Sequence, residues 1–168
     1  MTSSDREADA ALSPDFQDFI FCLNAHNVGY VLVGGYALGV HGVVRATADI
    51  DFLYRRTQAN VRRLIAAMNE FGAPSNVIDE DALMNAGIVT QFGKPPHRID
   101  LLNEIDGVTF ADVWKGATTA RIGGQQMKVI GLSELLENKG ATGRNKDKED
   151  LRQLNARHAR AAKRRRTT

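Results

Sequence analysis

Three aspartates in two apolar segments have the chemistry of a cation site. Asp49 and Asp51 flank Ile50 in the segment DIDFLY, and Asp100 lies between apolar neighbours in the segment RIDLL. Successive side chains of a strand point to opposite faces, so Asp49 and Asp51 would share a face. If the two segments are paired strands, all three carboxylates converge, and a cation relieves their mutual repulsion. Oxygen ligands of this kind favour Mg²⁺ or Mn²⁺.

A structural role remains the alternative for each acid. Asp49 and Asp51 could form the charged edge of an ordinary strand, and Asp100 could be a surface acid of an edge strand. However, an acid inside an otherwise apolar strand needs a partner or a function. Together the three carboxylates could hold two cations about 3.5–4 Å apart, which clamp an attacking and a leaving oxygen.

Thirteen residues separate a glycine pair from Asp49. Gly34 and Gly35 follow the apolar run at 30–33 (YVLV). Where a strand gives way to a helix, unpaired backbone N–H groups can bind phosphate. Glycine has no Cβ atom, so the backbone can approach a triphosphate closely. The pair therefore predicts a phosphate-binding turn, although a tight turn without a ligand would use the same residues.

Basic side chains must balance the charge of a triphosphate. Lys139, Arg144 and Lys146 fall around a predicted helix–loop–helix junction, and Arg45 lies four residues before Asp49. Their side chains could bind phosphate oxygens. Lys139 and Lys146 could instead be surface lysines, and Arg45 could form a salt bridge with the acids.

The elements that hold these residues follow from capping signals and periodicity. The residues at 13–15 (SPD) predict a helix start, because serine caps, proline suits the first turn and an acid favours the positive end of the helix. Ser133 predicts the cap of a helix through Lys139, followed by a loop at 140–143. Strands are predicted at 30–33, 49–54, 88–92 and 98–102, a hairpin over 119–130, and further helices at 36–41, after Thr57, at 79–85, at 108–114 and from 146 onward.

Composition limits the class of protein. The 168 residues suit one domain, and 43% apolar with 25% charged residues is ordinary for a globular chain. The single cysteine excludes an internal disulfide and favours a reducing compartment. There is neither an apolar run of the ~20 residues that cross a bilayer nor a signal peptide, so we expect a cytoplasmic protein of bacterial type without membrane contact.

Charge is unevenly distributed along the chain. The net charge of +2 predicts no general binding of polyanions, yet residues 157–166 (RHARAAKRRR) hold six Arg or Lys and no acid. Such a run is typical of a solvated helix end or a loose tail. An arm that touches phosphate or RNA is the alternative.

The glycine pair, the Asp-x-Asp pair and the third acid together resemble the nucleotidyltransferase superfamily. Its members include kanamycin- and lincosamide-modifying enzymes, poly(A) polymerases and bacterial toxin enzymes. The segment ENKGATGRNKDKEDL is similar to the ending K-x-x-A-x-R-x-K-D-x-x-D-L of small bacterial nucleotidyltransferase-like proteins, and the resemblance extends over residues 14–156. The chain departs from the most active members at Gly35, where they have serine.

The resemblance implies an α+β fold of the nucleotidyltransferase (polymerase-beta-like) type, with a mixed β-sheet and helices packed mainly on one face. The corresponding organisation is a disordered N-terminus at 1–12, a nucleotidyltransferase-like domain at 13–156 and a basic C-terminal tail at 157–168.

The resemblance also implies a reaction. A nucleoside monophosphate would pass from a nucleoside triphosphate such as ATP to an acceptor hydroxyl of a small molecule, tRNA or protein, with release of pyrophosphate. Asp49, Asp51 and Asp100 would be catalytic and hold Mg²⁺ or Mn²⁺, while Gly34 and Gly35 would hold the β- and γ-phosphates.

Acceptor recognition could come from a homodimer partner or from the basic tail. The alternative function is a catalytically weak or inactive member of the fold that binds nucleotide or RNA, or acts in a toxin–antitoxin pair.

Overall fold

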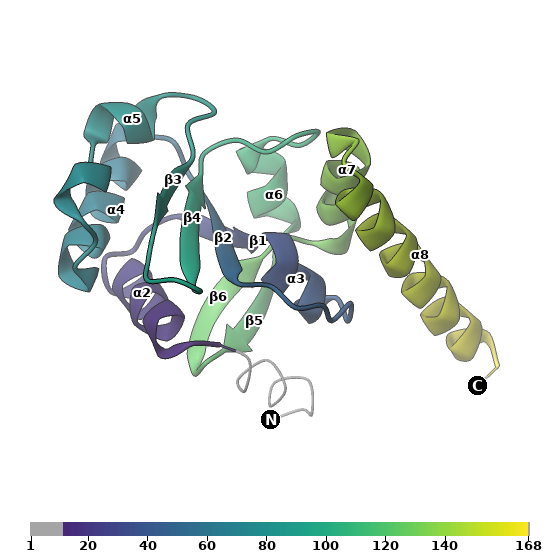
Figure 1. Ribbon diagram of the computed structural model, residues 1–168. Helices are drawn as coiled ribbons and strands as arrows, with labels where there is room; N and C mark the ends of the chain where they lie inside the picture. Colours follow the sequence, from purple (N-terminus) through teal and green to yellow (C-terminus); the bar gives the residue numbers. More distant parts are fainter. Residues whose placement is uncertain (1–11, 168) are drawn as a thin grey trace.

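A six-stranded mixed sheet forms the centre of the fold (Figure 1). The computed structural model describes residues 12–167. The strand order is β3-β4-β2-β1-β6-β5, with parallel pairing of β2 to β4 and of β1 to β6 and antiparallel pairing elsewhere. The strands are β1 (Tyr30–Val33), β2 (Asp49–Tyr54), β3 (Thr90–Phe92), β4 (Arg98–Leu102), β5 (Thr118–Ile122) and β6 (Gln125–Val129).

Two helices cover the face of the sheet on which Phe52 lies. α2 (Pro14–Ala25) begins where predicted, because the Ser13 hydroxyl accepts a hydrogen bond from the Phe16 N–H. α4 (Gln58–Phe71) begins after Thr57, which caps Asn60 in the same way. Aromatic rings join this layer, with Phe19 of α2 at 5.8 Å from Phe52 between ring centroids. A short 3₁₀ turn (Ser75–Val77) and α5 (Glu80–Met84) connect α4 to β3.

The remaining helices lie toward the other end of the sheet (Figure 1). α3 (Gly34–Val40) follows β1 without a loop, and α6 (Phe110–Gly116) lies between β4 and β5 in the chain. α7 (Leu132–Thr142) contacts α6 and α8 (Asn145–Arg166). α8 projects away from the sheet as a single long helix.

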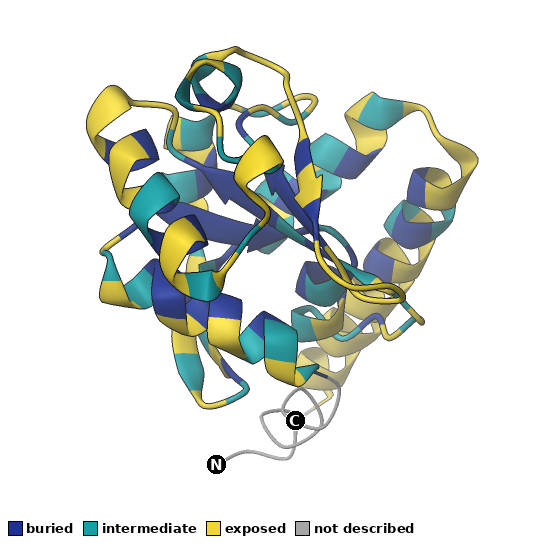
Figure 2. Ribbon diagram, turned by 60° about the vertical axis from the view of Figure 1, so that its left-hand side comes forward, coloured by how far each residue is buried: buried dark blue, intermediate teal, exposed yellow. Residues whose placement is uncertain are grey.

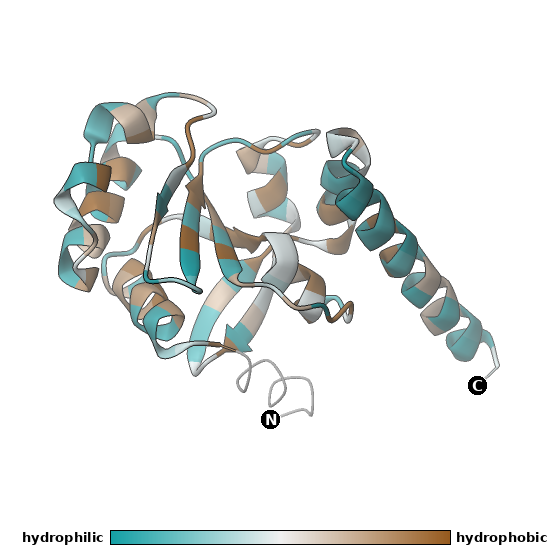
Figure 3. Cartoon of the chain, viewed as in Figure 1, coloured by the Kyte–Doolittle hydropathy of each residue, from teal (hydrophilic) through white to brown (hydrophobic). Residues whose placement is uncertain are grey.

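Most buried residues lie in the sheet and the helices packed on it, and buried residues become fewer along α8. Ile50 and Phe52 are almost fully buried, whereas Asp49 and Asp51 on the opposite face are partly accessible. Figure 2 shows most of the sheet buried, although the edge strand β5 is largely exposed, and Figure 3 shows a mostly hydrophilic α8. No helix among residues 12–167 combines the length and the apolar character that a bilayer crossing requires.

Most predicted elements are confirmed, and three details differ. Leu12, assigned above to the disordered N-terminus, is buried, while residues 1–11 and 168 lie outside the described part. α7 begins at Leu132 after Gly131, so Ser133 is not its cap. The helix also continues through 140–142, where a loop was predicted, because Gly143 supplies the left-handed residue that ends it. The predicted basic tail is helical through Arg166.

Candidate active site

The parallel pairing of β2 with β4 aligns the three aspartates. Asp51 lies opposite Asp100, and Asp49 lies opposite Arg98. Side chains paired in this register point to the same face of the sheet, away from Ile50. The structure therefore brings together the two strands that the sequence pattern paired, with their acids on one face.

Arg98 joins two of these carboxylates, and the sequence-based prediction did not include it. Its Nε atom donates to Asp100 Oδ1 at 2.7 Å, and Nη2 donates to Asp100 Oδ2 at 3.0 Å and to Asp49 Oδ2 at 2.9 Å. The planar guanidinium suits this two-sided contact. The alternation in RID was the available signal, because it places Arg98 and Asp100 on one face of the strand.

Asp51 is the most perturbed acid of the group. Burial first, then the negative charge of Asp100, a hydrogen bond to the Asp100 carboxyl and the charge of Asp49 raise the pKa of Asp51 to about 7. The positive charge of Lys139 partly opposes this shift. Near neutral pH the facing pair Asp51 and Asp100 therefore retains a proton, because two adjacent carboxylates repel when both are ionised.

The glycine pair packs directly against the strand that carries these acids. Gly34 has a left-handed backbone (φ +72°), and a Cβ atom there would overlap with the Asp51 carboxylate. At Gly35 a Cβ atom would lie 3.1 Å from both the Cβ and the Oγ1 atoms of Thr47. Thr47 is held in place because its hydroxyl donates to the Asp49 carbonyl at 3.0 Å. The two glycines thus let the turn and the acids approach each other closely.

The Thr47 contact gives a physical reason for glycine at position 35, where the resemblance described above leads us to expect serine. Gly35→Ser is expected to destabilise the protein by about 1 kcal/mol, because Thr47 must yield space. Adding Thr47→Ala should recover most of that loss, so the two changes will not be additive in urea unfolding. Additive losses would contradict this explanation.

Three of the predicted phosphate-binding residues contact two further acids at the start of α8. Lys139 Nζ lies 2.7 Å from Asp147 Oδ1 and 3.1 Å from Asp150 Oδ2. Arg144 Nε lies 2.6 Å from Asp147 Oδ2, and Arg45 Nε lies 3.2 Å from Asp150 Oδ1. Lys139, Asp147 and Asp150 are all at most 5% exposed. Lys139 is therefore a buried ion-pair partner and not a surface lysine.

Asp147 is stabilised in its ionised form by this cluster. Burial alone would raise its pKa, but hydrogen bonds from Lys139, Thr142 and Arg144 lower the pKa of Asp147 to about 2. Neither Asp147 nor Asp150 was predicted as a functional residue. Both lie in the segment that carries the family resemblance, on successive turns of one helix face.

A cleft of about 490 Å³ connects these groups. Among the four basic residues predicted to bind phosphate, Lys146 alone has no carboxylate partner within the described part of the chain. The cleft is lined by all the predicted site residues, namely Gly34, Gly35, Arg45, Asp49, Asp51, Asp100, Lys139, Arg144 and Lys146, and also by Thr47, Arg98, Glu104, Asp106, Asn138, Thr142 and Asp147.

The oxygen donors match a hard divalent cation, but they do not form a ready-made cage. Among residues 12–167 no three His, Cys, Asp or Glu side chains converge closely enough to hold a metal. Arg98 separates Asp49 from Asp100, and a hydrogen bond joins Asp51 to Asp100. The carboxylates fit a cation once the guanidinium moves away and Asp51 loses its proton.

Three solved structures share this fold. Lincomycin-bound lincosamide antibiotic adenylyltransferase LnuA has a TM-score of 0.56 at 14% identity, over 86% of this chain and 97% of LnuA. A putative nucleotidyltransferase from Thermotoga maritima has a TM-score of 0.53 at 13% identity, over 90% of this chain and 88% of its own. ANT(2")-Ia in complex with adenylyl-2"-tobramycin has a TM-score of 0.51 at 16% identity, over 90% of this chain and 95% of ANT(2")-Ia. At these identities the likeness confirms the predicted α+β nucleotidyltransferase fold alone.

A family model extends the comparison to the sequence. The model described as "Nucleotidyl transferase of unknown function (DUF2204)" matches residues 14–166, which include both aspartate strands and all of α8. Among curated protein sequences there is no significant match. The resemblance inferred from the glycine pair and the three aspartates is thereby confirmed, and the chain belongs to this nucleotidyl transferase family of unknown function.

Proposed function

We propose that the protein is a metal-dependent nucleotidyltransferase that moves a nucleoside monophosphate from a nucleoside triphosphate to an acceptor hydroxyl and releases pyrophosphate. The observation that carries this proposal is the placement of Asp51 opposite Asp100, directly beside the Gly34 turn. A purely structural sheet has no reason to place a buried and a half-buried carboxylate opposite each other beside a glycine turn.

The three aspartates have distinct tasks in this proposal. Asp49, Asp51 and Asp100 would hold Mg²⁺ or Mn²⁺, which when bound would polarise the phosphate and stabilise the charge that develops during transfer. Asp51, whose pKa is raised to about 7, must lose its proton before it can act as a ligand. Asp100 is placed to accept the proton of the acceptor hydroxyl.

The basic residues of the cleft divide into two groups. Lys146 and Arg144 have accessible side chains that can reach a triphosphate, and 72% of the Arg144 side chain is exposed. Lys139 and Arg45 form ion pairs with Asp147 and Asp150, so we propose that they stabilise the wall of the cleft. Lys139 also contributes positive charge close to Asp51.

A small-molecule hydroxyl is the acceptor that the neighbouring structures favour. One neighbour is bound to lincomycin, and another is in complex with adenylyl-2"-tobramycin. The chain spans nearly the whole length of both proteins, so their common architecture needs no additional large domain.

The test of the proposal has two parts. Calorimetric titration of the full chain with ATP and Mg²⁺ should give saturable binding that requires both components. Incubation with labelled nucleotide and a cell lysate, followed by mass spectrometry, should then show a nucleotidylated acceptor. An unmutated protein that binds neither metal nor nucleotide would refute the enzyme hypothesis.

A catalytically inactive member of the family is the second candidate function. The strongly basic second half of α8 favours it, because that half lies outside the cleft. Nucleotide binding without any transferred product in the lysate experiment would support this second candidate.

Arg98 provides a separate prediction about cation binding. Because its guanidinium occupies the space between Asp49 and Asp100, Arg98→Gln is expected to tighten Mn²⁺ binding about tenfold without nucleotide. Arg144→Gln removes a charge from the same cleft without touching the three aspartates, and should change the Mn²⁺ affinity much less. Equal changes in the two variants, measured by calorimetry, would show that only net charge matters.

A further inference from the structure

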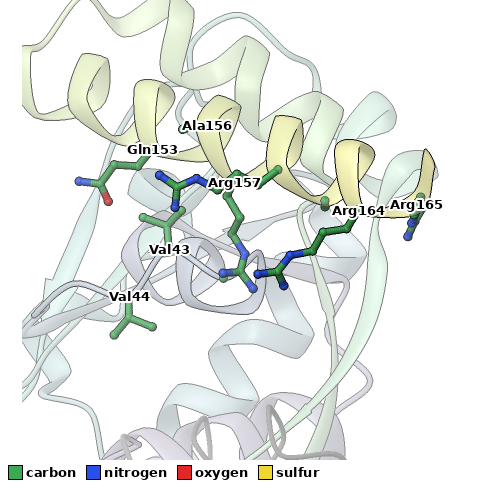
Figure 4. Close-up of a pocket in the computed structure, with 10 residues that line it drawn as sticks. Val43, Val44, Gln153, Ala156, Arg157, Arg164 and Arg165 are labelled. Atoms are coloured by element: carbon green, nitrogen blue, oxygen red, sulfur yellow. The ribbon is translucent and has the colours of Figure 1, made fainter. Parts of the chain in front are cut away.

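A second cleft lies between the outer half of α8 and the loop that precedes β2 (Figure 4). It has a volume of about 600 Å³ and shares no lining residue with the aspartate cleft. We call it the arginine groove. It is lined by Gly42, Val43, Val44, Gln153, Ala156, Arg157, Arg160, Ala161, Arg164 and Arg165.

The α8 residues of the groove form one stripe along the helix. Positions 153, 156, 157, 160, 161 and 164 recur at intervals of three and four, which is the spacing of a single helix face. Figure 4 shows Arg157 and Arg164 on the side of α8 that faces the loop with Val43 and Val44. The arginines therefore line one continuous wall, with successive turns about 5.4 Å apart.

The charge of this wall is not balanced by acids of its own segment. Residues 151–168 contain seven Arg or Lys and no Asp or Glu. The last acid before them, Asp150, is buried and paired with Lys139 and Arg45. Because the whole chain has a net charge of only +2, the rest of the molecule is net acidic. Positive charge is thus concentrated on one helix.

The opposite wall is shaped to receive the arginines. Gly42 has a left-handed backbone (φ +87°), and a Cβ atom there would overlap with the Arg157 guanidinium. The side chain therefore lies directly against the loop backbone. Beside it, Val44 is 85% exposed and offers an apolar surface next to the charged row.

We propose that the arginine groove binds a strand of nucleic acid through its phosphates. Five of the six cations in residues 157–166 are arginine, whose planar fork binds phosphate oxygens in pairs. A nucleic-acid strand carries a charge about every 3.4 Å of helix axis, so it can follow a row of cations along several helical turns. The exposed surface of Val44 suits contact with a sugar or base. This binding is independent of nucleotidyl transfer in the aspartate cleft.

Three other occupants fit less well. A membrane requires large apolar anchors, and residues 155–166 contain none larger than alanine. A second copy of the same surface would bring two arginine rows face to face. An acidic peptide offers charge but not the regular phosphate spacing that a row of guanidinium groups can follow.

The proposal is tested with two labelled 20-nucleotide single strands of one mixed sequence, one RNA and one DNA. Binding to the full chain is followed by fluorescence anisotropy between 50 and 200 mM KCl. The groove variant carries Arg157→Gln, Arg160→Gln and Arg164→Gln. The matched control carries Lys148→Gln, Lys163→Gln and Arg166→Gln, which removes the same charge from α8 positions that do not line the groove.

We expect the groove variant to bind at least about tenfold more weakly at 100 mM KCl, with a salt slope reduced by about two. The control should lose much less affinity, and both variants should retain nucleotide binding in the aspartate cleft. Residues 157–167 are all exposed, so deletion of residues 157–168 should reproduce the loss. The strand that binds more tightly, RNA or DNA, identifies the natural class of nucleic acid.

Several results would overturn the proposal. Equal weakening in the groove and control variants would reduce the effect to net charge. Tighter binding of poly-glutamate than of either strand would indicate an acidic protein partner. Binding to anionic lipid vesicles but not to either strand would indicate a membrane surface.

Discussion

Asp51→Asn is expected to lower nucleotidyl transfer by about 10²-fold or more and, in the metal-free protein, to raise the melting temperature above pH 7. The loss of transfer follows from removing an ionised ligand and from disturbing the facing Asp100. The gain in stability follows from removing a carboxyl whose ionised form the native fold disfavours. Opposite effects on activity and stability are typical of residues kept for function.

The pH dependence of the gain follows from the two pKa values. The ordinary pKa of Asp51 is 3.8, and the folded state raises it to about 7. Between these values the native state holds a proton that the unfolded state has released, so native stability falls as pH rises. Asparagine does not ionise. The variant should therefore gain nothing below pH 4 and most above pH 7, where each kcal/mol appears as about 2–4 °C.

Asp49→Asn is the matched comparison. The Asp49 side chain is 37% exposed and pairs with Arg98, so its replacement should also reduce transfer but should not stabilise the protein. Calorimetric melting scans at pH 4 and pH 8, with transfer measured on the same preparations, distinguish the two variants. A stabilised Asp49→Asn, or an unchanged Asp51→Asn at pH 8, would contradict the assignment of the raised pKa.

Lys139→Met is expected to destabilise the fold by about 3–5 kcal/mol, because it leaves Asp147 and Asp150 buried without their common cation. Urea unfolding of the purified variant measures this loss. Lys146→Met is the control, since Lys146 is exposed and has no carboxylate partner among the described residues. It should change stability by less than about 0.5 kcal/mol. Losses of similar size would mean that Lys139 contributes no more than an ordinary lysine.

The stabilisation that ionised Asp147 provides is lost at acid pH. The folded pKa of Asp147 is about 2, below the ordinary 3.8, so its ionised form stabilises the native state above pH 4. That contribution is lost as the pH falls from 3.8 toward 2. The stability difference between the unmutated protein and Asp147→Asn should therefore shrink over this interval.

The aspartate strands could be predicted because their information is local. Alternation within DIDFLY and RIDLL determines which side chains share a face, and both strands have the predicted bounds. Ser13 and Thr57 could be identified as caps for the same reason, since a cap acts on backbone groups three residues away.

The polar partners of the site could not be predicted in this way. Lys139 reaches Asp150 across the junction of two helices, and Arg45 meets the same acid from a loop more than a hundred residues earlier. Spacing along the chain does not encode such contacts, because they depend on how α7 and α8 pack. The helical continuation through 140–142 was missed because glycine propensity was outweighed by the packing of α7 on α8.

The burial profile of α8 divides the helix into two parts with different rates of opening. Leu154 is its last buried residue, and every residue from 155 to 167 is exposed. Beyond Leu154 the backbone amides are protected mainly by the helix itself, so they should exchange with deuterium far sooner than those near Asp147 and Asp150. We expect the outer half of α8 to exchange slowly only when a nucleic-acid strand fills the arginine groove. Amide exchange would therefore report the occupancy of the groove without a fluorescent label.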